Sequence, residues 1–377
     1  MYSRLISIPN KESIFLFGPR GTGKSHWVTT QFPKANYLNL LDDALFTELL
    51  AFPSRLEQKI IDPKEYTILD EVQKIPPLLD EVHRLIESKK LKFILTGSSP
   101  RKLRRGGANL LAGRAMTRKL YPLTSQELGK DFNLKKALKF GTLPKSAASS
   151  EPNTFLKSYV ATYLKEEIQA EGLTRNLASF ARFLEAASFS QAQVLNVSNI
   201  GSEAHIQQKV AESYFEILED LLLASQLPVF TRRAKRKLIA HPKFFFFDTG
   251  VFNTMRPRGP LDSESDIGGV SLESFVWQDF TALNDYLNWE YSSYYWRTRS
   301  KVKVDFVFYG PRGFKAIEVK SSSRIRPEDL SSLLTFKEDY PEADLFLIYG
   351  GLKTIPHKDI KIIPAELWFK GYSQYFE

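Results

Sequence analysis

A glycine-rich turn that follows an apolar run constrains this chain more than any other part of its sequence. Residues 14–17 read Ile-Phe-Leu-Phe, which is typical of a buried strand, and residues 18–25 read Gly-Pro-Arg-Gly-Thr-Gly-Lys-Ser. The second stretch matches the pattern G-x-x-x-x-G-K-[ST], a turn between strand and helix whose backbone N–H groups bind phosphate. Residues 26–31 can form the helix that the pattern requires, so a chance glycine-rich turn is the weaker interpretation.

The positions of this turn have separate expected tasks. Lys24 is expected to reach the β- and γ-phosphates of a nucleotide, and Ser25 to bind Mg²⁺. The following helix directs its N-terminal dipole at the anion. The sequence therefore predicts a site for ATP and Mg²⁺. The residues expected to curve around the phosphate oxygens are Gly18, Gly21, Thr22 and Gly23.

Two carboxylates end another apolar run. Tyr66-Thr-Ile-Leu69 is followed by Asp70 and Glu71. Asp70 is expected to hold Mg²⁺ through water, and Glu71 to act as the general base that polarises the attacking water. One predicted strand, residues 37–40, lies along the chain between the glycine-rich turn at residues 18–25, which is called the P-loop, and this strand. We take that order to favour the hydrolytic branch of P-loop proteins over a small-molecule kinase. A simple helix cap is the alternative explanation of the acidic pair.

Polar residues at the next strand end complete the expected nucleotide site. Residues 93–96 are apolar until Thr96, and Thr96 or Ser98 is the candidate for sensing the γ-phosphate. An ordinary turn after the strand is the alternative. Arg114 is a candidate arginine finger, acting within or between subunits, and a solvated or phosphate-facing arginine is the alternative. The arginines that compete for this role are Arg101, Arg104 and Arg105.

Helical periodicity marks the middle of the chain. Apolar residues recur at helical spacing over residues 203–224, and residues 194–201 predict a short helix and a turn before it. Helix, turn, long helix and basic hairpin are the order of a winged helix, whose wing would contact DNA phosphates. A solvated basic hairpin is the alternative. The wing residues expected on DNA are Arg232, Arg233, Lys235, Arg236 and Lys237.

The last third carries a D…E-x-K pattern that is typical of metal-dependent nucleases. If residues 310–313 form a hairpin loop, Asp305 lies directly opposite Glu318, and Lys320 lies on the same face. Paired carboxylates on neighbouring strands can bind Mg²⁺, and Lys320 can orient the attacking water. Glu273, on a preceding predicted helix, is the expected third ligand.

Two other interpretations of this pattern stay open. Asp305, Glu318 and Lys320 can form ion pairs on a surface hairpin. Alternatively, a nuclease fold can be retained to grip DNA without cleaving it. The neighbouring residues that suit a phosphate backbone in either nuclease-like interpretation are Arg297, Arg299, Lys301 and Lys303.

Composition excludes several other classes of protein. The chain has 377 residues, 43% of them hydrophobic, so disorder throughout is excluded. It has no Cys and 5 His, which rules out disulfides and thiolate zinc sites and disfavours a His-rich metal site. No apolar run approaches the length of a membrane span, and no leader pattern opens the chain. We expect a cytoplasmic protein, and the net charge of +9 suggests a polyanionic partner.

Taken together, the motifs resemble a family of prokaryotic AAA-superfamily ATPases that carry a C-terminal domain of uncharacterised function. The motifs of the ATPase part are Gly-Lys-Ser25, Leu-Asp-Glu71-Val-Gln73, Leu-Thr-Gly-Ser-Ser99, Leu-Ala-Gly-Arg114 and Tyr-Pro-Leu123. The motifs of the C-terminal part are Phe-Asp248-Thr-Gly250, Leu-Glu273, and Val-Asp305 with Glu318-Val-Lys320. One departure is Val304, which stands where the nuclease motif usually has Pro.

This resemblance implies an α/β protein of three parts: a parallel-sheet P-loop NTPase domain, a helical and winged-helix middle, and a restriction-endonuclease-like end. It assigns Walker roles to Lys24, Ser25, Asp70 and Glu71. Nuclease-like roles would fall to Glu273, Asp305, Glu318 and Lys320. The expected divisions are the ATPase domain at residues 1–128, a linker at 129–153, the middle domain at 154–240 and the nuclease-like domain at 241–377.

The expected function is ATP binding and hydrolysis by a protein that acts on DNA, with a Mg²⁺-dependent nuclease-like site at the C-terminal end. A homo-oligomer is compatible with this expectation. The alternative is an ATP-dependent switch or scaffold that binds a protein partner and carries an inactive nuclease fold.

Overall fold

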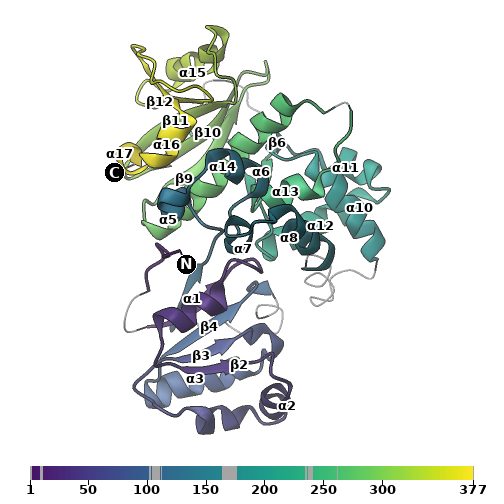
Figure 1. Ribbon diagram of the computed structural model, residues 1–377, viewed down its shortest axis with the longest axis vertical. Helices are drawn as coiled ribbons and strands as arrows, with labels where there is room; N and C mark the ends of the chain where they lie inside the picture. The colour runs from purple at the N-terminus through teal and green to yellow at the C-terminus, as the bar shows by residue number, and fades with distance from the viewer. Residues whose placement is uncertain are drawn as a thin grey trace. The chain divides into compact units, whose positions relative to one another are not determined.

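The computed structural model describes residues 2–8, 12–101, 103, 111, 113–163, 176–233, 236, 241–260 and 262–376. The chain forms two compact units (Figure 1). The smaller, which we call the P-loop unit, consists of Arg4–Tyr121 with Ile217–Leu223. The larger unit consists of Met1–Ser3, Pro122–Glu216 and Ala224–Glu377. The predicted residues Arg104, Arg105, Lys235 and Lys237 lie outside the described part of the chain.

A five-stranded parallel sheet forms the centre of the P-loop unit. Its order is β2-β3-β4-β1-β5, and each neighbouring pair runs in the same direction. This confirms the predicted parallel sheet, and β1 to β4 each lie within about two residues of the apolar runs that predicted them. The strands are β1 (Ser13–Phe17), β2 (Asn36–Asn39), β3 (Thr67–Asp70), β4 (Phe93–Gly97) and β5 (Ala115–Lys119).

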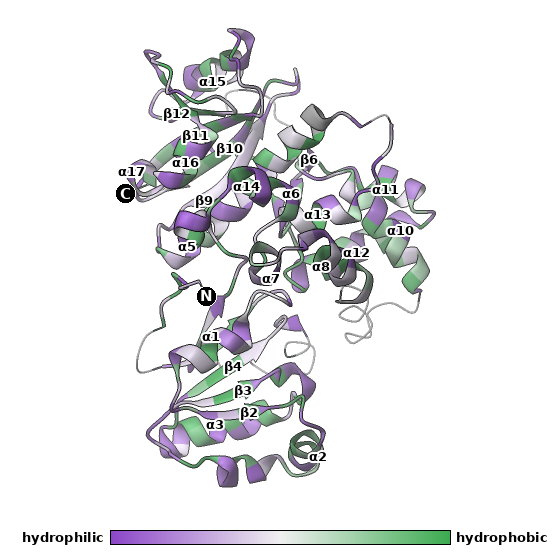
Figure 2. Ribbon diagram, viewed as in Figure 1, coloured by the Kyte–Doolittle hydropathy of each residue, from purple (hydrophilic) through white to green (hydrophobic). Residues whose placement is uncertain are grey.

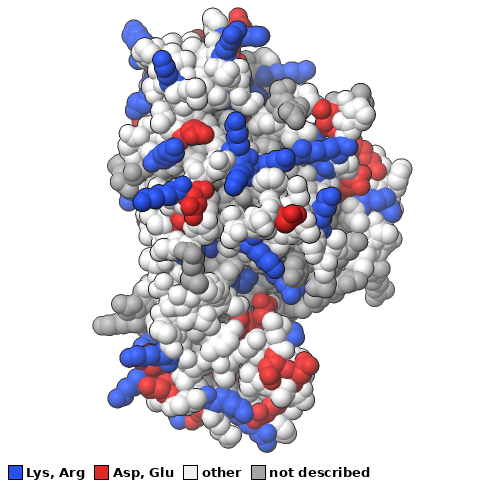
Figure 3. Space-filling view, in the orientation of Figure 1, with Lys and Arg blue, Asp and Glu red and all other residues white. Residues whose placement is uncertain are grey.

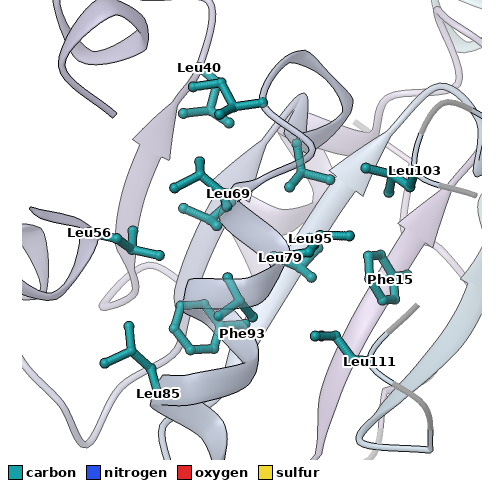
Figure 4. Packing of buried hydrophobic residues seen from close by; sticks show 14 of the residues in the cluster. Phe15, Leu40, Leu56, Leu69, Leu79, Leu85, Phe93, Leu95, Leu103 and Leu111 are labelled. Atoms are coloured by element: carbon teal, nitrogen blue, oxygen red, sulfur yellow. The ribbon is translucent and has the colours of Figure 1, made fainter. Parts of the chain in front are cut away.

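Alternation along the strands decides which side chains enter the core of this unit. Phe15 on β1 and Phe93 and Leu95 on β4 face the same side and pack against α3 (Figure 4). Helix α3 is amphipathic, with apolar residues at helical spacing, and Figure 2 shows hydrophobic and hydrophilic residues alternating along it. The helices are α1 (Lys24–Gln31), α2 (Asp43–Ala51), α3 (Leu78–Lys89), and the 3₁₀ turns η1 (Pro53–Lys59) and η2 (Val72–Lys74).

The larger unit begins with short helices where the sequence suggested a connector. Helix α6 contacts α13 (Thr249–Met255) and α14 (Glu264–Tyr286). Its Ala137 is buried, and the carbonyl of Ala137 accepts a hydrogen bond from Thr249 Oγ1 at 2.7 Å. Residues 129–153 therefore pack as part of this unit. The helices are α5 (Ser125–Leu128), η3 (Gly129–Asp131), α6 (Leu134–Phe140), α7 (Pro144–Ala147), α8 (Pro152–Ser158) and a π-helical turn, η4 (Tyr159–Tyr163).

Three helices and a small antiparallel sheet follow. The sheet has the order β6-β8-β7, so β8, the last of its strands along the chain, lies in the centre and pairs with both neighbours. The long helix expected over residues 203–224 is confirmed at α12, although it is shorter because the chain bends at Leu221–Leu223 into β7. The elements are α10 (Leu177–Ser188), β6 (Gln193–Val194), α11 (Val197–Glu203), α12 (Gln208–Asp220), β7 (Ala224–Leu227) and β8 (Lys243–Phe246).

The end of the chain forms a mixed sheet of order β13-β12-β11-β10-β9. Strands β9, β10 and β11 are antiparallel neighbours, whereas β11, β12 and β13 are parallel. Tyr309 pairs with Phe314, which is the predicted hairpin register. The elements are β9 (Ser292–Arg297), β10 (Lys303–Gly310), β11 (Gly313–Lys320), α15 (Glu328–Asp339), β12 (Asp344–Tyr349), β13 (Ile360–Pro364), α16 (Ala365–Lys370) and α17 (Ser373–Phe376).

Candidate functional site

The P-loop connects β1 to α1 through three glycines with distinct reasons to be glycine. Gly21 and Gly23 have φ values of 85° and 91°, a left-handed region that side chains disfavour. Gly18 is fixed by close packing instead, since a Cβ on it would lie 2.3 Å from the carbonyl oxygen of Leu120. Gly23 precedes the first turn of α1, so the N-terminus of this helix opens at the loop.

Side chains hold this loop closed from both ends. Lys24 Nζ donates to the carbonyl of Gly18 at 2.7 Å, and Thr22 Oγ1 donates to the carbonyl of Pro19 at 2.9 Å. Arg4 donates to the carbonyl of Thr22 at 2.9 Å and to that of Tyr121 at 2.6 Å. Arg4 carries no motif, so the sequence analysis missed this contribution to the shape of the loop.

Asp70 lies at the carboxyl end of β3, next to the end of β4, and hydroxyl groups hold it. Its carboxylate accepts hydrogen bonds from Thr96 and, at 2.5 Å, from Tyr37. Burial and this bond to Asp70 raise the pKa of Tyr37 well above its ordinary value, while a hydrogen bond with Ser25 opposes the rise. Tyr37 thus links the predicted Mg²⁺ residues Ser25 and Asp70. It comes from β2, and no sequence signal marked it.

Glu71 begins the turn after β3 with a φ of 63°, a left-handed conformation that costs a non-glycine residue about 1 kcal/mol. Its backbone N–H donates to Thr96 Oγ1 at 3.2 Å, and its carboxylate accepts from Gln73 Nε2 at 2.5 Å. Gln73 also reaches Ser98 Oγ at 3.4 Å. The strand ends therefore bring together Asp70, Glu71, Thr96 and Ser98, as the sequence predicted, and add Gln73 as an amide between Glu71 and Ser98.

These residues fit ATP and Mg²⁺. The loop supplies backbone N–H groups and one ammonium group for phosphate oxygens, and Ser25 and Asp70 supply the oxygen atoms that Mg²⁺ prefers. The hydroxyl groups of Tyr37 and Thr96 that hold Asp70 carry no charge, so they do not neutralise its carboxylate.

The arginines occupy different edges of the sheet. Arg114 directly precedes β5, whose first residue, Ala115, pairs with Ser13 at the start of β1. Because the strands are parallel, Arg114 lies at the edge opposite the P-loop, and it forms an ion pair with Glu87 on α3. The structure therefore does not bring it to the nucleotide of its own chain. Arg101 follows β4, is buried and pairs with Asp220.

A second group of charged residues lies in the larger unit, and we call it the carboxylate–lysine cluster. It combines the predicted residues with Lys243, which the sequence analysis did not place at a site, and with Lys303, which it assigned to a phosphate backbone. Its members are Glu273 on α14, Asp305 and Lys303 on β10, Glu318 and Lys320 on β11, and Lys243 on β8.

Lys243 lies at the centre of this cluster. Its ammonium group donates to Glu273 Oε1 at 2.6 Å and to Asp305 Oδ1 at 3.1 Å. Lys303 donates to the same Asp305 oxygen at 3.0 Å, and the backbone N–H of Val319 donates to the other oxygen at 3.1 Å. The partners thus use both oxygens of Asp305.

Glu318 has a different environment. Lys320 Nζ donates to its Oε1 at 2.9 Å, whereas its Oε2 is buried and accepts no hydrogen bond from the described residues. Burial and the charge of Asp305 raise the pKa of Glu318 to about 7. Burial and Asp305 also raise the pKa of Glu273.

Asp305 and Lys243, which hold each other at the centre of the cluster, stay charged. Burial alone would raise the pKa of Asp305, but the attraction of Lys243 and Lys303 outweighs it and lowers that pKa far below its ordinary value. Burial likewise opposes the charge of Lys243, while Asp305 and Glu273 outweigh it and raise the pKa of Lys243.

This arrangement does not fit the divalent cation that the D…E-x-K pattern predicted. Within the described part of the chain, no group of three or more His, Cys, Asp or Glu side chains could hold a metal ion. The predicted face is confirmed, since Asp305 and Glu318 lie on neighbouring strands at the expected register. Tertiary structure adds Lys243, whose ammonium group lies between two of the three predicted ligands.

A row of basic residues borders the cluster. In the strand register, Lys303 on β10 lies opposite Arg297 on β9. Continuing the hairpin register of β10 and β11 places Lys303 opposite Lys320. Like charges side by side are unfavourable unless anions compensate them. Exposed Arg299 and Lys301 lie in the loop that joins β9 to β10.

The predicted basic wing lies against the C-terminal sheet where it is described. Arg236 pairs with Asp339 at 2.9 Å and with Glu338 at 2.9 Å, at the end of α15. The guanidinium group of Arg232 lies 4.7 Å from the ring centre of Tyr309. Arg232 and Arg236, which the sequence analysis assigned to DNA, thus contact residues of the same chain.

Three family models match successive parts of the chain. An AAA domain model matches residues 10–129, which supports a P-loop ATPase domain in this part of the chain. Two domains of unknown function, DUF8612 and DUF4143, match residues 131–262 and 268–368. The second boundary falls after α13 and after β8, the central strand of the β6-β8-β7 sheet, whereas the sequence analysis begins the last domain at residue 241.

Searches among known proteins add weak likenesses. The structure of the ORC2 protein of Aeropyrum pernix in its ADP form has a TM-score of 0.30 and 13% identity, covering 57% of this chain and 81% of that one. The A. pernix ORC1 protein in complex with DNA has a TM-score of 0.25 and 13% identity, with 66% and 87% covered. Protein VC1899 of Vibrio cholerae has a TM-score of 0.24 and 10% identity, with 87% and 95% covered. TM-scores this low do not establish a shared fold. No curated protein matches.

None of the described helices combines the length and the apolar character that crossing a membrane requires.

Proposed function

We propose that this chain hydrolyses ATP at the P-loop of its AAA-type domain and binds a nucleic-acid backbone through its C-terminal sheet. In the ATP site, Lys24 contacts the β- and γ-phosphates, and Ser25 and Asp70 hold Mg²⁺. Glu71 accepts a proton from the attacking water. Thr96 and Ser98 at the end of β4 sense the γ-phosphate.

The position of Glu71 carries the hydrolytic part of this proposal. Its carboxylate is partly exposed at the carboxyl edge of the sheet, and Gln73 holds it by a neutral amide at 2.5 Å. A carboxylate at this position can take a proton from water, which is the requirement for a general base. Its strained backbone supports a role in the reaction, because strain of this kind concentrates at functional sites.

Charge distribution supports binding of a polyanion at the C-terminal sheet. Residues 297–326 contain nine Lys and Arg but two Asp and Glu. Figure 3 shows Lys and Arg predominating over the upper part of the visible face, which belongs to the larger unit. Arg299 and Lys301 are exposed beside the row of Arg297, Lys303 and Lys320. The exposed pair, Arg299 and Lys301, suits the phosphate groups of a nucleic-acid backbone, whereas Lys303 and Lys320 already pair with Asp305 and Glu318.

Helix α12 is a poor candidate for the nucleic-acid contact. In a winged helix this element would enter the major groove. It carries one Lys, Lys209, against Glu212, Glu216, Glu219 and Asp220, so its charge would repel a phosphate backbone. We therefore propose the nucleic-acid contact at Arg299 and Lys301, in the loop between β9 and β10, rather than at α12.

ATP turnover tests the first part of the proposal. We expect Lys24→Ala to abolish hydrolysis in a steady-state phosphate-release assay, because the loop loses the cation that reaches the phosphates. Exposed Lys34→Ala, in the same unit, serves as the control and should leave turnover unchanged. Full turnover in Lys24→Ala would refute the nucleotide site.

Salt-dependent DNA binding tests the second part. We expect Arg299→Gln with Lys301→Gln to weaken binding and to reduce the slope of log K against log salt by about 2. Arg312→Gln with Lys361→Gln removes the same charge from exposed positions outside the row and should leave the slope near that of the native chain. Equal slopes in all three proteins would refute the contact. A protein partner, and hence the switch interpretation, would then be favoured.

A further inference from the structure

We infer that Lys243 is the resident cation of the carboxylate–lysine cluster and takes the place that a divalent metal would need between Glu273 and Asp305. The cluster is thus complete without metal, and the C-terminal sheet lacks the ion that D…E-x-K nucleases use for cleavage. The part of the inference that concerns DNA rests on the proposed function. The part that concerns the metal does not.

The hydrogen bonds of the cluster leave few oxygens for a metal. Lys243 Nζ lies 2.6 Å from Glu273 Oε1 and 3.1 Å from Asp305 Oδ1. The second oxygen of Asp305 accepts the N–H of Val319 at 3.1 Å. A divalent cation bound by these carboxylates would have to displace the ammonium group and break its two ion pairs.

The backbone of Lys243 is fixed, so its ammonium group cannot easily leave. Lys243 pairs with Val194 on β6 and with Leu227 on β7, which places it in the central strand of its sheet. The aromatic rings of Tyr295 and Phe306 flank its ammonium group at 5.7 and 5.9 Å. Lys243 itself is only 2% exposed.

Charge balance points the same way. The cluster contains three carboxylates and three ammonium groups, from Lys243, Lys303 and Lys320. Buried carboxylates are stable when cations pair with them, and these lysines supply that pairing without an external ion. Adding a divalent cation to a balanced cluster would leave excess positive charge in a buried place.

Mn²⁺ binding to the nucleotide-free full-length protein tests this inference, measured by the electron paramagnetic resonance signal of free Mn²⁺. We expect the native protein and Glu318→Gln to bind the same number of ions. A site present in the native protein and lost in Glu318→Gln would overturn the inference. Because both proteins contain the same P-loop, ions bound there cancel, and the result does not depend on the proposed ATPase activity.

Removal of the lysine gives the converse test. We expect Lys243→Ala to gain one Mn²⁺ site per chain, and the double variant Lys243→Ala with Glu318→Gln to lose it again. Mn²⁺ should also raise the melting temperature of Lys243→Ala and leave that of the native protein unchanged. Lys315→Ala, which removes another buried lysine, from β11 of the C-terminal sheet, should gain no site. If Lys243→Ala folds and gains no site, Lys243 does not occupy a cation position and the inference fails. If it does not fold, the comparison of native protein with Glu318→Gln decides alone.

Discussion

The P-loop unit and the larger unit each bring acidic side chains to the ends of sheet strands, yet they treat the negative charge differently. In the P-loop unit, the hydroxyl groups of Tyr37 and Thr96 hold Asp70, and the amide of Gln73 holds Glu71. In the larger unit, Lys243 and Lys303 hold Asp305 through ammonium groups. The hydroxyl donors of Asp70 fix its carboxylate without adding positive charge, whereas the ammonium groups at Asp305 neutralise the carboxylate that they hold.

This difference separates a site that can attract a cation from one that already contains its cations. Acidic residues in a nuclease-like pattern do not by themselves make a metal site, because a lysine from another part of the fold can complete them. The donor set therefore decides the chemistry, and four substitutions test this contrast.

The largest effect is expected for Glu71→Gln. The variant keeps the size and hydrogen bonds of the side chain but cannot accept a proton from water. We expect turnover to fall by about 10²- to 10⁴-fold while ATP binding is retained, measured by phosphate release and by binding of a fluorescent ATP analogue. Asp80→Asn, at an exposed carboxylate on α3, is the control. Normal turnover in Glu71→Gln would place the base elsewhere.

Lys243→Met should destabilise the larger unit by about 3 to 5 kcal/mol, because it removes the ammonium group that Glu273 accepts from and one of the two that hold Asp305. Adding Glu273→Leu should recover part of the loss, since the pair is then replaced by apolar groups. Urea unfolding of the three proteins measures the effect. A double variant less stable than Lys243→Met would show that Glu273 does not depend on Lys243.

Asp279→Asn tests a buried carboxylate that the same unit holds by neutral donors. Asp279 accepts hydrogen bonds from the N–H and the hydroxyl of Ser125, each at 2.7 Å, and burial raises its pKa to about 7. Between about pH 4 and 7 the folded protein binds the proton more tightly than the unfolded chain, so this residue makes stability fall as pH rises through that window. An amide carries no charge; its oxygen can accept the N–H of Ser125, and its NH₂ group can donate to the Ser125 hydroxyl, which also reaches the carbonyl of Phe369.

We therefore expect Asp279→Asn to raise the free energy of unfolding at pH 8 by about 2 to 4 kcal/mol and to change it little at pH 4. Urea unfolding at the two pH values checks this. Equal destabilisation at both values would contradict the role of burial.

The smallest effect is expected for Tyr37→Phe, which removes one hydrogen bond to Asp70. We expect ATP turnover to fall about 5-fold at limiting Mg²⁺, in line with about 1 kcal/mol for such a bond, and less at saturating Mg²⁺. The control is Tyr66→Phe. Tyr66 directly precedes β3, and its hydroxyl donates to the carbonyl of Glu12. An effect that Mg²⁺ does not change would make the role of Tyr37 purely structural.

Local patterns were sufficient where neighbouring residues in the chain build the structure. The strand, turn and helix of the P-loop follow from the apolar run, the glycines and the helix-forming residues after them. Asp70 and Glu71 could be placed because parallel strands end at the same edge of a sheet. The pairing of Asp305 with Glu318 followed from one hairpin loop, since the loop fixes the register of both strands.

The sequence by itself therefore determined the P-loop, the parallel sheet around it and the face that Asp305 and Glu318 share. Only the tertiary structure decided what surrounds these groups. Lys243 reaches Asp305 from 62 residues away, and Tyr37 reaches Asp70 from a different strand. Strand direction places Arg114 at the edge opposite the P-loop. The physical reason is that short-range patterns specify backbone conformation and register, whereas the charge state of a site depends on side chains that the packing of distant elements brings together.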